Sequence, residues 1–195
     1  MIVQFYSVIV MTLGSVAWAK GGPHPPQDPG RYRIDAGHSS IQFKAHHHDA
    51  GYTWGHFVRF SGSFETGKEG ALKSIEATAR ARSVDTDSFF RDLHLRSLHY
   101  LGVYRFPTIS FTAQSIEALE GGHWSVSGPL ELHGATIPLT VEVFKTGEGI
   151  GPFGKERYGL ETEFSISLSE FGIVREGIGD ELHVFVNLEG VKNRD

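Results

Sequence analysis

The sequence predicts an all-β fold, an eight-stranded antiparallel up-and-down barrel with one helix inserted between the third and fourth strands. Apolar and polar residues alternate along most of the chain, which is typical of antiparallel strands with one buried and one wet face. Short turns containing glycine, such as Thr66–Gly70 and Glu120–Gly122, join these segments. Eight consecutive antiparallel strands close most simply into a barrel, because closure removes the unpaired edges.

The N-terminus has the pattern of a signal peptide. Residues 1–19 carry no charged side chain, contain a short apolar run, and end in Ala17-Trp18-Ala19, an A-x-A cleavage pattern. We expect cleavage after Ala19 and export to the periplasm. An uncleaved anchor is the alternative, because the first residues lack Lys and Arg. A leader rich in Pro and Gly follows at 20–30, and the barrel domain occupies 31–195.

The expected elements follow in order along this domain. The eight strands cover residues 32–48, 53–66, 71–83, 108–119, 122–133, 137–147, 156–168 and 181–192. At roughly 3.3 Å per residue the first strand, if straight, spans on the order of 50 Å, which predicts a deep tube. The inserted helix is expected near 87–98, where Phe90, Leu93 and Leu98 recur at helical spacing before Pro107. A second helical turn is expected after Ser169.

Composition excludes several classes of function. The 195 residues suit one domain, and a formal charge of −5 argues against binding to nucleic acid. The absence of Cys excludes thiolate nucleophiles, iron–sulfur clusters and zinc sites built from Cys. The chain also lacks G-x-S-x-G and H-E-x-x-H patterns. We therefore expect a protein that is not an enzyme and that needs no metal or organic cofactor.

The third strand indicates an internal cavity. It places Ala77, Ala79 and Ala81 in succession on its apolar side. Three small residues in a row leave space that a solid core would fill with larger side chains. At eight strands a barrel interior is either filled or just wide enough for one small ligand. The alternative, that Phe side chains from facing strands fill the space, stays open at this point.

Seven stretches, in order and at normal spacing, match one known family. They are IDAGHSSIQFKAHH (34–47), GHFVRFSGSFE (55–65), SVDTD (83–87), RDLHLRS (91–97), RFPTISF (105–111), LELHGATIPLTVEV (130–143) and IGDELHVFVNLEG (178–190). Together they resemble the YceI-like family of polyisoprenoid-binding proteins. The resemblance implies an exported, lipocalin-like barrel whose long apolar pore holds a polyisoprenoid or a similar amphiphile. Some members of the family are associated with b-type cytochromes and quinone-linked redox chemistry.

The inward positions and the resemblance together predict a set of ligand-binding residues. We expect the pore to be lined by Ile41, Phe43, His47, Tyr52, Trp54, Phe57, Ala77, Ala79, Ala81, Phe90, Leu95, Phe111, Leu132, Val141 and Phe164. By resemblance His47 corresponds to the family's usual His, and it shares the apolar side of its strand with Phe43. Its imidazole could hydrogen-bond a ligand hydroxyl or quinone carbonyl. The alternative is a core His whose partners are all in the protein.

The stretch HHHDAGYTWGHF (46–57) raises the question of a metal site. On a strand, His46 and His48 point to the side opposite His47, and could chelate zinc or copper with help from His56 or Asp49. That side is the outer one, so a metal site there would lie outside the barrel. Metal binding is the alternative to lipid binding. Where His46 and His56 stand, the family pattern has basic residues, often Arg, which bears on the polar end of any ligand.

The charged segment RDLHLRS (91–97) has two interpretations. Its charged side chains could form a cationic cap over a phosphate or carboxylate headgroup. Equally, Asp92 with Arg96, and Asp85 with Arg91, could form structural pairs. We favour the structural reading, with Phe90 and Leu95 facing the pore or plugging one end.

The function expected from the sequence is binding, transport or storage of a long-chain apolar lipid in the periplasm, either a polyisoprenoid or an isoprenoid quinone. The alternatives are a metal-binding protein that uses His46, His48 and His56, and a lipid isomerase or cyclase that uses His47 inside the barrel. Transient contact with a membrane or a membrane redox protein is expected, and the sequence leaves a homodimer open.

Overall fold

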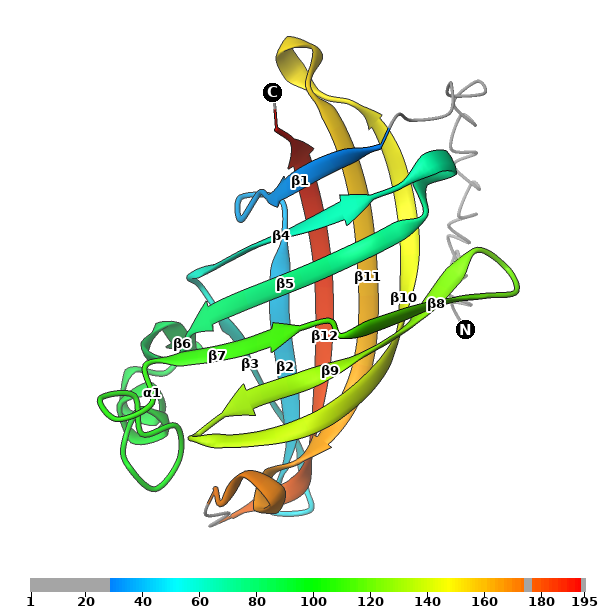
Figure 1. Cartoon of the computed structure of the whole chain (residues 1–195). Coiled ribbons are helices and arrows are strands. Elements are labelled where there is room, and N and C mark those ends of the chain that lie inside the picture. Colours follow the sequence, from blue (N-terminus) through cyan, green and yellow to red (C-terminus); the bar gives the residue numbers. More distant parts are fainter. Residues whose placement is uncertain (1–28, 174–176, 194–195) are drawn as a thin grey trace, which may run out of the picture.

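The computed structural model describes residues 29–173 and 177–193. The expected signal peptide and most of the leader, residues 1–28, lie outside the described residues. The predicted fold class is confirmed: the described chain is a closed antiparallel barrel with one α-helix (Figure 1). The strands are β1 (Gly30–Ile34), β2 (Ser40–His47), β3 (Gly51–Phe57), β4 (Phe60–Thr66), β5 (Leu72–Arg80), β6 (Val84–Asp85), β7 (Thr108–Thr112), β8 (Ser115–Leu119), β9 (His123–Leu132), β10 (Ala135–Ile150), β11 (Glu156–Ser167) and β12 (Ile178–Lys192).

Twelve strand segments build the eight barrel strands, because several predicted strands are interrupted. The first divides into β1 and β2, the second into β3 and β4, and the fourth into β7 and β8, while β6 continues β5. The sheet order is β1-β4-β5-β7-β9-β10-β11-β12-β2-β3-β6, with β8 on β9, and β12 also pairs with β1. This last pairing closes the barrel.

A turn causes the first interruption. The backbone N–H of His38 donates to the Asp35 carbonyl at 3.0 Å, and the Gly37 N–H donates to Asp35 Oδ1 at 3.1 Å. An aspartate that bonds its own backbone two residues on is typical of turns. β12 spans this break, since its Glu189 carbonyl accepts from the Asp35 N–H at 2.8 Å and its Glu189 N–H donates to Ser39 Oγ at 2.8 Å.

The inserted helix, α1 (Phe89–Leu95), is shorter than predicted and lies beside β6 (Figure 1). The short 3-10 segments are η1 (Lys68–Gly70), η2 (Ala81–Ser83), η3 (Pro152–Gly154) and η4 (Leu168–Phe171). The last of them is the helical turn expected near Ser169.

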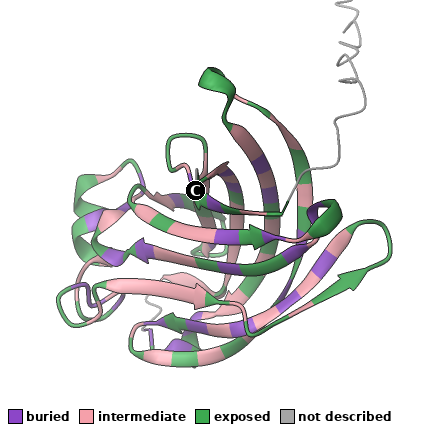
Figure 2. Cartoon of the chain, turned by 45° about the horizontal axis from the view of Figure 1, so that its top comes forward, coloured by how far each residue is buried: buried purple, intermediate pink, exposed green. Residues whose placement is uncertain are grey.

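Buried and exposed residues alternate along the strands (Figure 2), and the buried ones form two separate clusters. We call the first the filled half; its buried members are Tyr32, Ile34, Phe64, Leu72, Ile75, Trp124, Val126, Val141, Val143, Tyr158, Leu160 and Leu188. We call the second the hollow half; its buried members are Tyr100, Leu130, Leu132, Leu168, Phe171 and Ile173.

Three aromatic rings pack at the centre of the filled half. Tyr32 stacks on Phe64 with ring centroids 5.1 Å apart, and Tyr158 lies 5.6 Å from Tyr32 and 5.8 Å from Phe64. The Tyr158 hydroxyl donates to the Gly70 carbonyl at 2.7 Å. Gly190 makes room for this group, because a Cβ there would lie 2.5 Å from the Phe64 ring. This half of the barrel has a solid interior.

Candidate functional site: a cavity in the hollow half

The hollow half encloses a cavity of about 220 Å³. Of its 28 lining residues, 22 are apolar or aromatic. The six polar ones are Gln42, His47, Thr53, Thr86, Arg91 and Ser110. An engineered apolar cavity of about 150 Å³ stays dry and binds benzene, so this volume suits an apolar guest.

Small side chains leave this space empty. Ala45, Ala77 and Ala79 line the cavity at positions where a solid core would carry larger groups. In the register of β5, Ala77 lies opposite Phe111 and Ala79 opposite Ile109. Residues that line the cavity and also pack against the filled cluster mark the boundary between the halves. They are Ala77, Phe111, Phe164 and Val186.

The structure places ten of the fifteen predicted pore residues on the cavity wall. They are Ile41, Phe43, His47, Phe57, Ala77, Ala79, Leu95, Phe111, Leu132 and Phe164. The alternation along each strand was the signal that located most of them.

Two of the other predicted residues, Tyr52 and Trp54, lie on the outer face. In the β2–β3 register Tyr52 is opposite His46 and Trp54 is opposite Lys44, so they share the outward side of that hairpin. Both are about half exposed. Lys44 Nζ lies 4.7 Å from the Tyr52 ring centroid, and Trp54 stacks on Phe185 of β12 at 5.5 Å. The inward positions of β3 belong instead to residues such as Thr53 and Phe57.

The remaining three predicted residues lie elsewhere for different reasons. Ala81 is buried, but it belongs to η2, where the strand periodicity has ended. Phe90 is 81% exposed on the outer surface of α1. Val141 points inward as predicted but is buried in the filled half. Its strand, β10, runs through both halves, and alternation does not show where along a strand a cavity ends.

The predicted set of pore residues left out the polar residues around α1, although a cationic cap from RDLHLRS was one of the two interpretations of that segment. Thr86 donates to Asp92 Oδ1 from its backbone N–H at 2.9 Å and from its hydroxyl at 2.6 Å. Arg91 donates to the Thr86 hydroxyl at 2.8 Å and to the Thr86 carbonyl. Thr86 and Asp92 are buried, and Thr86 and Arg91 line the cavity. A polar group of this kind, next to an apolar space, can meet the polar end of a ligand.

The two pairs expected in the RDLHLRS segment do not form, and both arginines bond other partners. Arg91 bonds Thr86 instead of Asp85. Arg96 donates to the backbone carbonyls of Arg82 at 2.9 Å and Val84 at 2.7 Å instead of pairing with Asp92. The Arg96 bonds tie α1 to η2 and β6, which is a structural role through partners other than the predicted ones. Arg91 also supplies a cation to the cavity wall, as the cationic-cap interpretation requires.

His47 lies at the mouth of the cavity. Its side chain lines the cavity, yet the residue is exposed, and its ring packs edge-on against His48 with centroids 4.3 Å apart. The alternative of a core His satisfied by buried protein groups therefore does not hold. Exposure leaves the imidazole accessible both to solvent and to a ligand in the cavity.

The three histidines of the metal alternative do not converge. In the β2–β3 register His56 is opposite Gln42, whereas His46 is opposite Tyr52. Four residues of strand therefore separate the two sites, roughly 13 Å at 3.3 Å per residue. His48 leaves the strand at a positive φ of 48°. Strand alternation had placed His46 and His48 on one side, but β2 ends at His47 and His48 lies in the turn.

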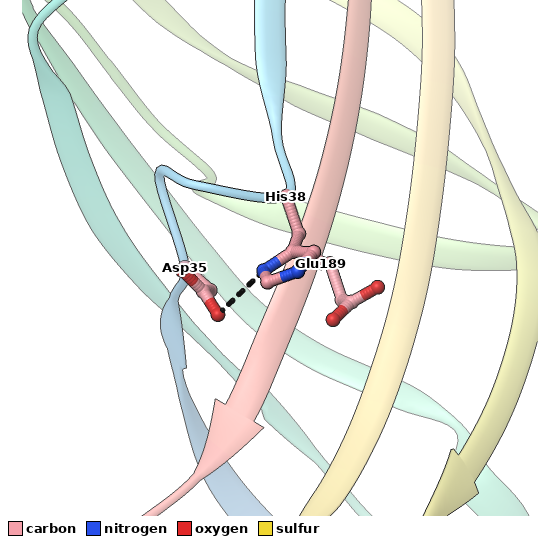
Figure 3. Close-up of side chains that lie close together, drawn as sticks. All are labelled: Asp35, His38 and Glu189. Atoms are coloured by element: carbon pink, nitrogen blue, oxygen red, sulfur yellow. Dashed lines mark hydrogen bonds and ion pairs between the residues drawn. The ribbon is translucent and has the colours of Figure 1, made fainter. Parts of the chain in front are cut away.

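A different group, Asp35, His38 and Glu189, brings its ligand atoms within 4.8 Å of one another (Figure 3). Arg157 Nη1 lies 3.1 Å from Asp35 Oδ2 and also bonds Glu189 Oε1. Burial alone would raise the pKa of the Asp35 carboxyl, but hydrogen bonds from His38, the Gly37 N–H and Arg157 hold it below its ordinary value. Because the Arg157 guanidinium already bridges the two carboxylates, we interpret the group as an ion cluster that fixes the break between β1 and β2.

The comparisons with known proteins agree with this architecture. A family model described as the YceI-like domain matches residues 32–190. The chain belongs to the YceI-like family. Protein YceI of Salmonella arizonae and that of Salmonella paratyphi B are each 32% identical over 195 residues, which cover 96% of this chain and 98% of theirs. No helix within the described residues has the length and apolar character to cross a membrane.

Solved structures share the fold at lower identity. BcnA of Burkholderia cenocepacia has a TM-score of 0.72 at 18% identity, covering 80% of this YceI-like chain and 98% of BcnA. A polyisoprenoid binding domain from Saccharophagus degradans, implicated in plant cell wall breakdown, has a TM-score of 0.61 at 16% identity, with 83% and 98% covered. The YCEI protein of Campylobacter jejuni gives 0.65 at 20% identity, with 72% and 85% covered.

Proposed function

We propose that this YceI-like protein binds one long-chain apolar lipid, a polyisoprenoid or an isoprenoid quinone, and carries or stores it unaltered in the periplasm. The observation that carries the proposal is the cavity of about 220 Å³ walled by 22 apolar or aromatic residues. The likeness to a solved polyisoprenoid binding domain supports the choice of ligand class. The signal-peptide pattern of residues 1–19 supports export, and the mature protein should begin at Lys20.

Burial of the lipid chain supplies the affinity. Each methylene-sized unit removed from water contributes about 0.8 kcal/mol, less the cost of immobilising the ligand. If about 150 Å³ accommodates the six carbons of benzene, a volume of about 220 Å³ accommodates roughly nine carbons, or about two isoprene units. A longer chain has to extend through the mouth at His47 or displace wall side chains. Affinity should therefore rise at least tenfold with each of the first two isoprene units.

A series of isoprenoid alcohols of increasing length tests this dependence. We expect the dissociation constant to fall steeply over the shortest members and more slowly afterwards. A dissociation constant that stays flat across the series would contradict the proposal. Native mass spectrometry of the purified protein, followed by extraction, should identify the lipid that copurifies. Recovery of a chemically changed lipid after incubation would contradict the carrier role and favour an isomerase or cyclase.

Two places on the wall can meet the polar end of the lipid. Arg91, which Thr86 holds beside α1, offers a cation, and His47 offers an imidazole at the mouth. Guanidinium and imidazole N–H groups donate to hydroxyl, carbonyl or phosphate oxygens. His47→Ala should weaken binding, whereas His56→Ala is the control, because His56 lies opposite Gln42 on the outward side of β3 and does not line the cavity. Equal affinity of both variants would exclude a direct role for His47.

A further inference from the structure

The outer surface of α1 and of the loop that follows it gathers exposed apolar side chains. Twelve large hydrophobic residues are exposed in the described chain, and five of them lie within residues 89–104. They are Phe89, Phe90, Leu93, Leu98 and Tyr104. Exposed apolar residues that occur singly need no explanation, but a concentration of them marks an interaction site.

The helix presents three of these side chains together. Phe89 and Phe90 precede Leu93 by four and three residues, so the three side chains lie on one face of α1. The Phe89 and Phe90 rings contact each other edge-on with centroids 5.6 Å apart, and the two residues are 71% and 81% exposed. Two adjacent phenyl rings in water are unfavourable unless something covers them.

The same segment closes one side of the cavity. Arg91, Leu95, Tyr100 and Leu101 line it from within. The sheet path ends at β6, which pairs with β3 at two positions, whereas β7 pairs with β5 and β9. In the described chain no strand ladder joins β6 to β7, and α1 lies at this place (Figure 1). A lipid could pass here by displacing α1, without breaking a strand ladder.

The charge of this surface differs from that of the whole chain. Among residues 82–106 the exposed charged side chains are Arg82, Arg91 and Arg105, against the single exposed carboxylate of Asp87, whereas the chain carries −5. The Arg82 guanidinium lies 5.3 Å from the Tyr104 ring centroid and donates to its hydroxyl at 3.2 Å. Phenyl and phenol rings beside arginines are the composition of segments that lie at the interface of anionic membranes.

We propose that α1 and the loop through residue 106 dock on an anionic lipid surface, and that lipid enters and leaves the cavity beneath this segment. This inference rests on the proposed function, because docking serves exchange only if the cavity holds a lipid. Arg82 and Arg105 meet the headgroups, and Phe89, Phe90 and Leu93 enter the interfacial region.

The test compares two double variants in sedimentation with vesicles. The first variant combines Phe89→Ser with Phe90→Ser and removes the two exposed phenyl rings of α1. The control, Ile150→Ser with Phe153→Ser, changes two residues that are 66% and 91% exposed on the β10–β11 hairpin, at the far end of the barrel from α1 (Figure 1). The vesicles contain phosphatidylcholine alone or phosphatidylcholine mixed with phosphatidylglycerol.

We expect the mature wild-type protein to sediment with the anionic vesicles and less with the neutral ones. The Phe89/Phe90 variant should lose at least tenfold in partition coefficient, because burial of two phenyl groups is removed, and the control should match wild type. Transfer of lipid between vesicles and protein should slow by a similar factor, while the amount of lipid bound at equilibrium stays the same. Thermal unfolding should be unchanged, since the replaced side chains are exposed.

Three outcomes would overturn the docking proposal. The wild type could fail to bind anionic vesicles, the two double variants could lose binding equally, or the Phe89/Phe90 variant could break a dimer in ultracentrifugation with vesicle binding intact. The last would assign this face to a second copy of the chain. Native mass spectrometry distinguishes failure of this inference from failure of the proposed function. If the protein contains lipid but does not bind vesicles, only the docking proposal is wrong. If the protein binds vesicles but contains no lipid, the lipid-carrier role is wrong.

Discussion

The two halves of the barrel are built from the same strands and have opposite interiors. β11 contributes Tyr158 and Leu160 to the filled half and Phe164 to the wall of the cavity. β12 likewise contributes Leu188 to the filled half, and Leu182 and Val184 to the cavity wall. Strand type and alternation therefore do not separate a core from a binding site. The two halves differ in the size of a few inward side chains and in the positions at which strands are interrupted.

The physical difference lies in what each inward ring contacts. In the filled half, Tyr32, Phe64 and Tyr158 touch one another, so each ring is surrounded by protein. In the hollow half, Phe43 contacts Phe57 on one side, with ring centroids 5.6 Å apart, and borders the cavity on the other. An apolar wall beside empty space forgoes dispersion contacts that a guest can restore.

The largest expected effect is on stability, for truncation of a ring in the filled half. Phe64→Ala should lower the free energy of unfolding by about 3–5 kcal/mol, because the buried ring leaves a void that its neighbours do not close. Phe43→Ala in the cavity wall should cost less than half as much, since that ring already borders empty space. Urea denaturation of both variants measures the difference. Equal losses would contradict the division into a filled and a hollow half.

Filling the cavity should weaken ligand binding while the barrel remains folded. Ala79→Phe places a ring in the space beside Phe60 and Ile109, so affinity for isoprenoid alcohols should fall at least tenfold while the barrel remains folded. Ala36→Phe, on the exposed turn between β1 and β2, is the size-matched control. Isothermal titration of both variants measures the effect. Undiminished affinity in Ala79→Phe would show that the ligand lies elsewhere.

The buried tyrosines of the filled half should make the stability of the protein fall at alkaline pH. Burial, with the charge of Glu156, raises the pKa of Tyr32 to about 12, and burial also raises the pKa of Tyr158. The folded state thus keeps protons that the unfolded state releases above about pH 10, so stability is full below that pH and falls as pH rises toward about 12.

Tyr158→Phe tests whether the buried tyrosines cause this alkaline fall in stability. It should cost about 1 kcal/mol at neutral pH, through loss of the hydrogen bond to the Gly70 carbonyl, and should flatten the alkaline decline. Tyr104→Phe, with its exposed ring, should leave the decline unchanged. Denaturation midpoints from pH 8 to pH 11 provide the measurement, and an equal decline in all three proteins would remove the tyrosines as its cause.

The smallest expected effect concerns the break that separates β1 from β2. The lowered pKa of Asp35 means that its contribution to stability is present above the ordinary carboxyl pKa of 3.8 and is lost as pH falls through the lower folded value. Asp35→Asn should therefore reduce stability slightly at neutral pH and flatten the acid side of the profile. Asp49→Asn, with an exposed carboxylate, is the control. A steeper acid decline in Asp35→Asn would contradict the assignment.

Several features could be predicted because their signals are local. Alternation located the inward side of β5, and hence Ala77 and Ala79 on the cavity wall. Helical spacing and a following proline located α1 to within a few residues. Tyr52 and Trp54 were misplaced because a three-residue turn sets the register of the β2–β3 hairpin, and that register puts both rings outside.

The sequence by itself determined the barrel, the order of its strands and the family, because hydrophobic period and turn chemistry act between neighbours along the chain. Only the tertiary structure decided where the barrel is solid and where it is empty. That depends on which side chains far apart in sequence meet in the interior, such as Tyr32 with Tyr158, which lie on the two strands that flank β12. The polar group of Thr86, Arg91 and Asp92 likewise exists only because α1 packs against β6 at the edge of the cavity.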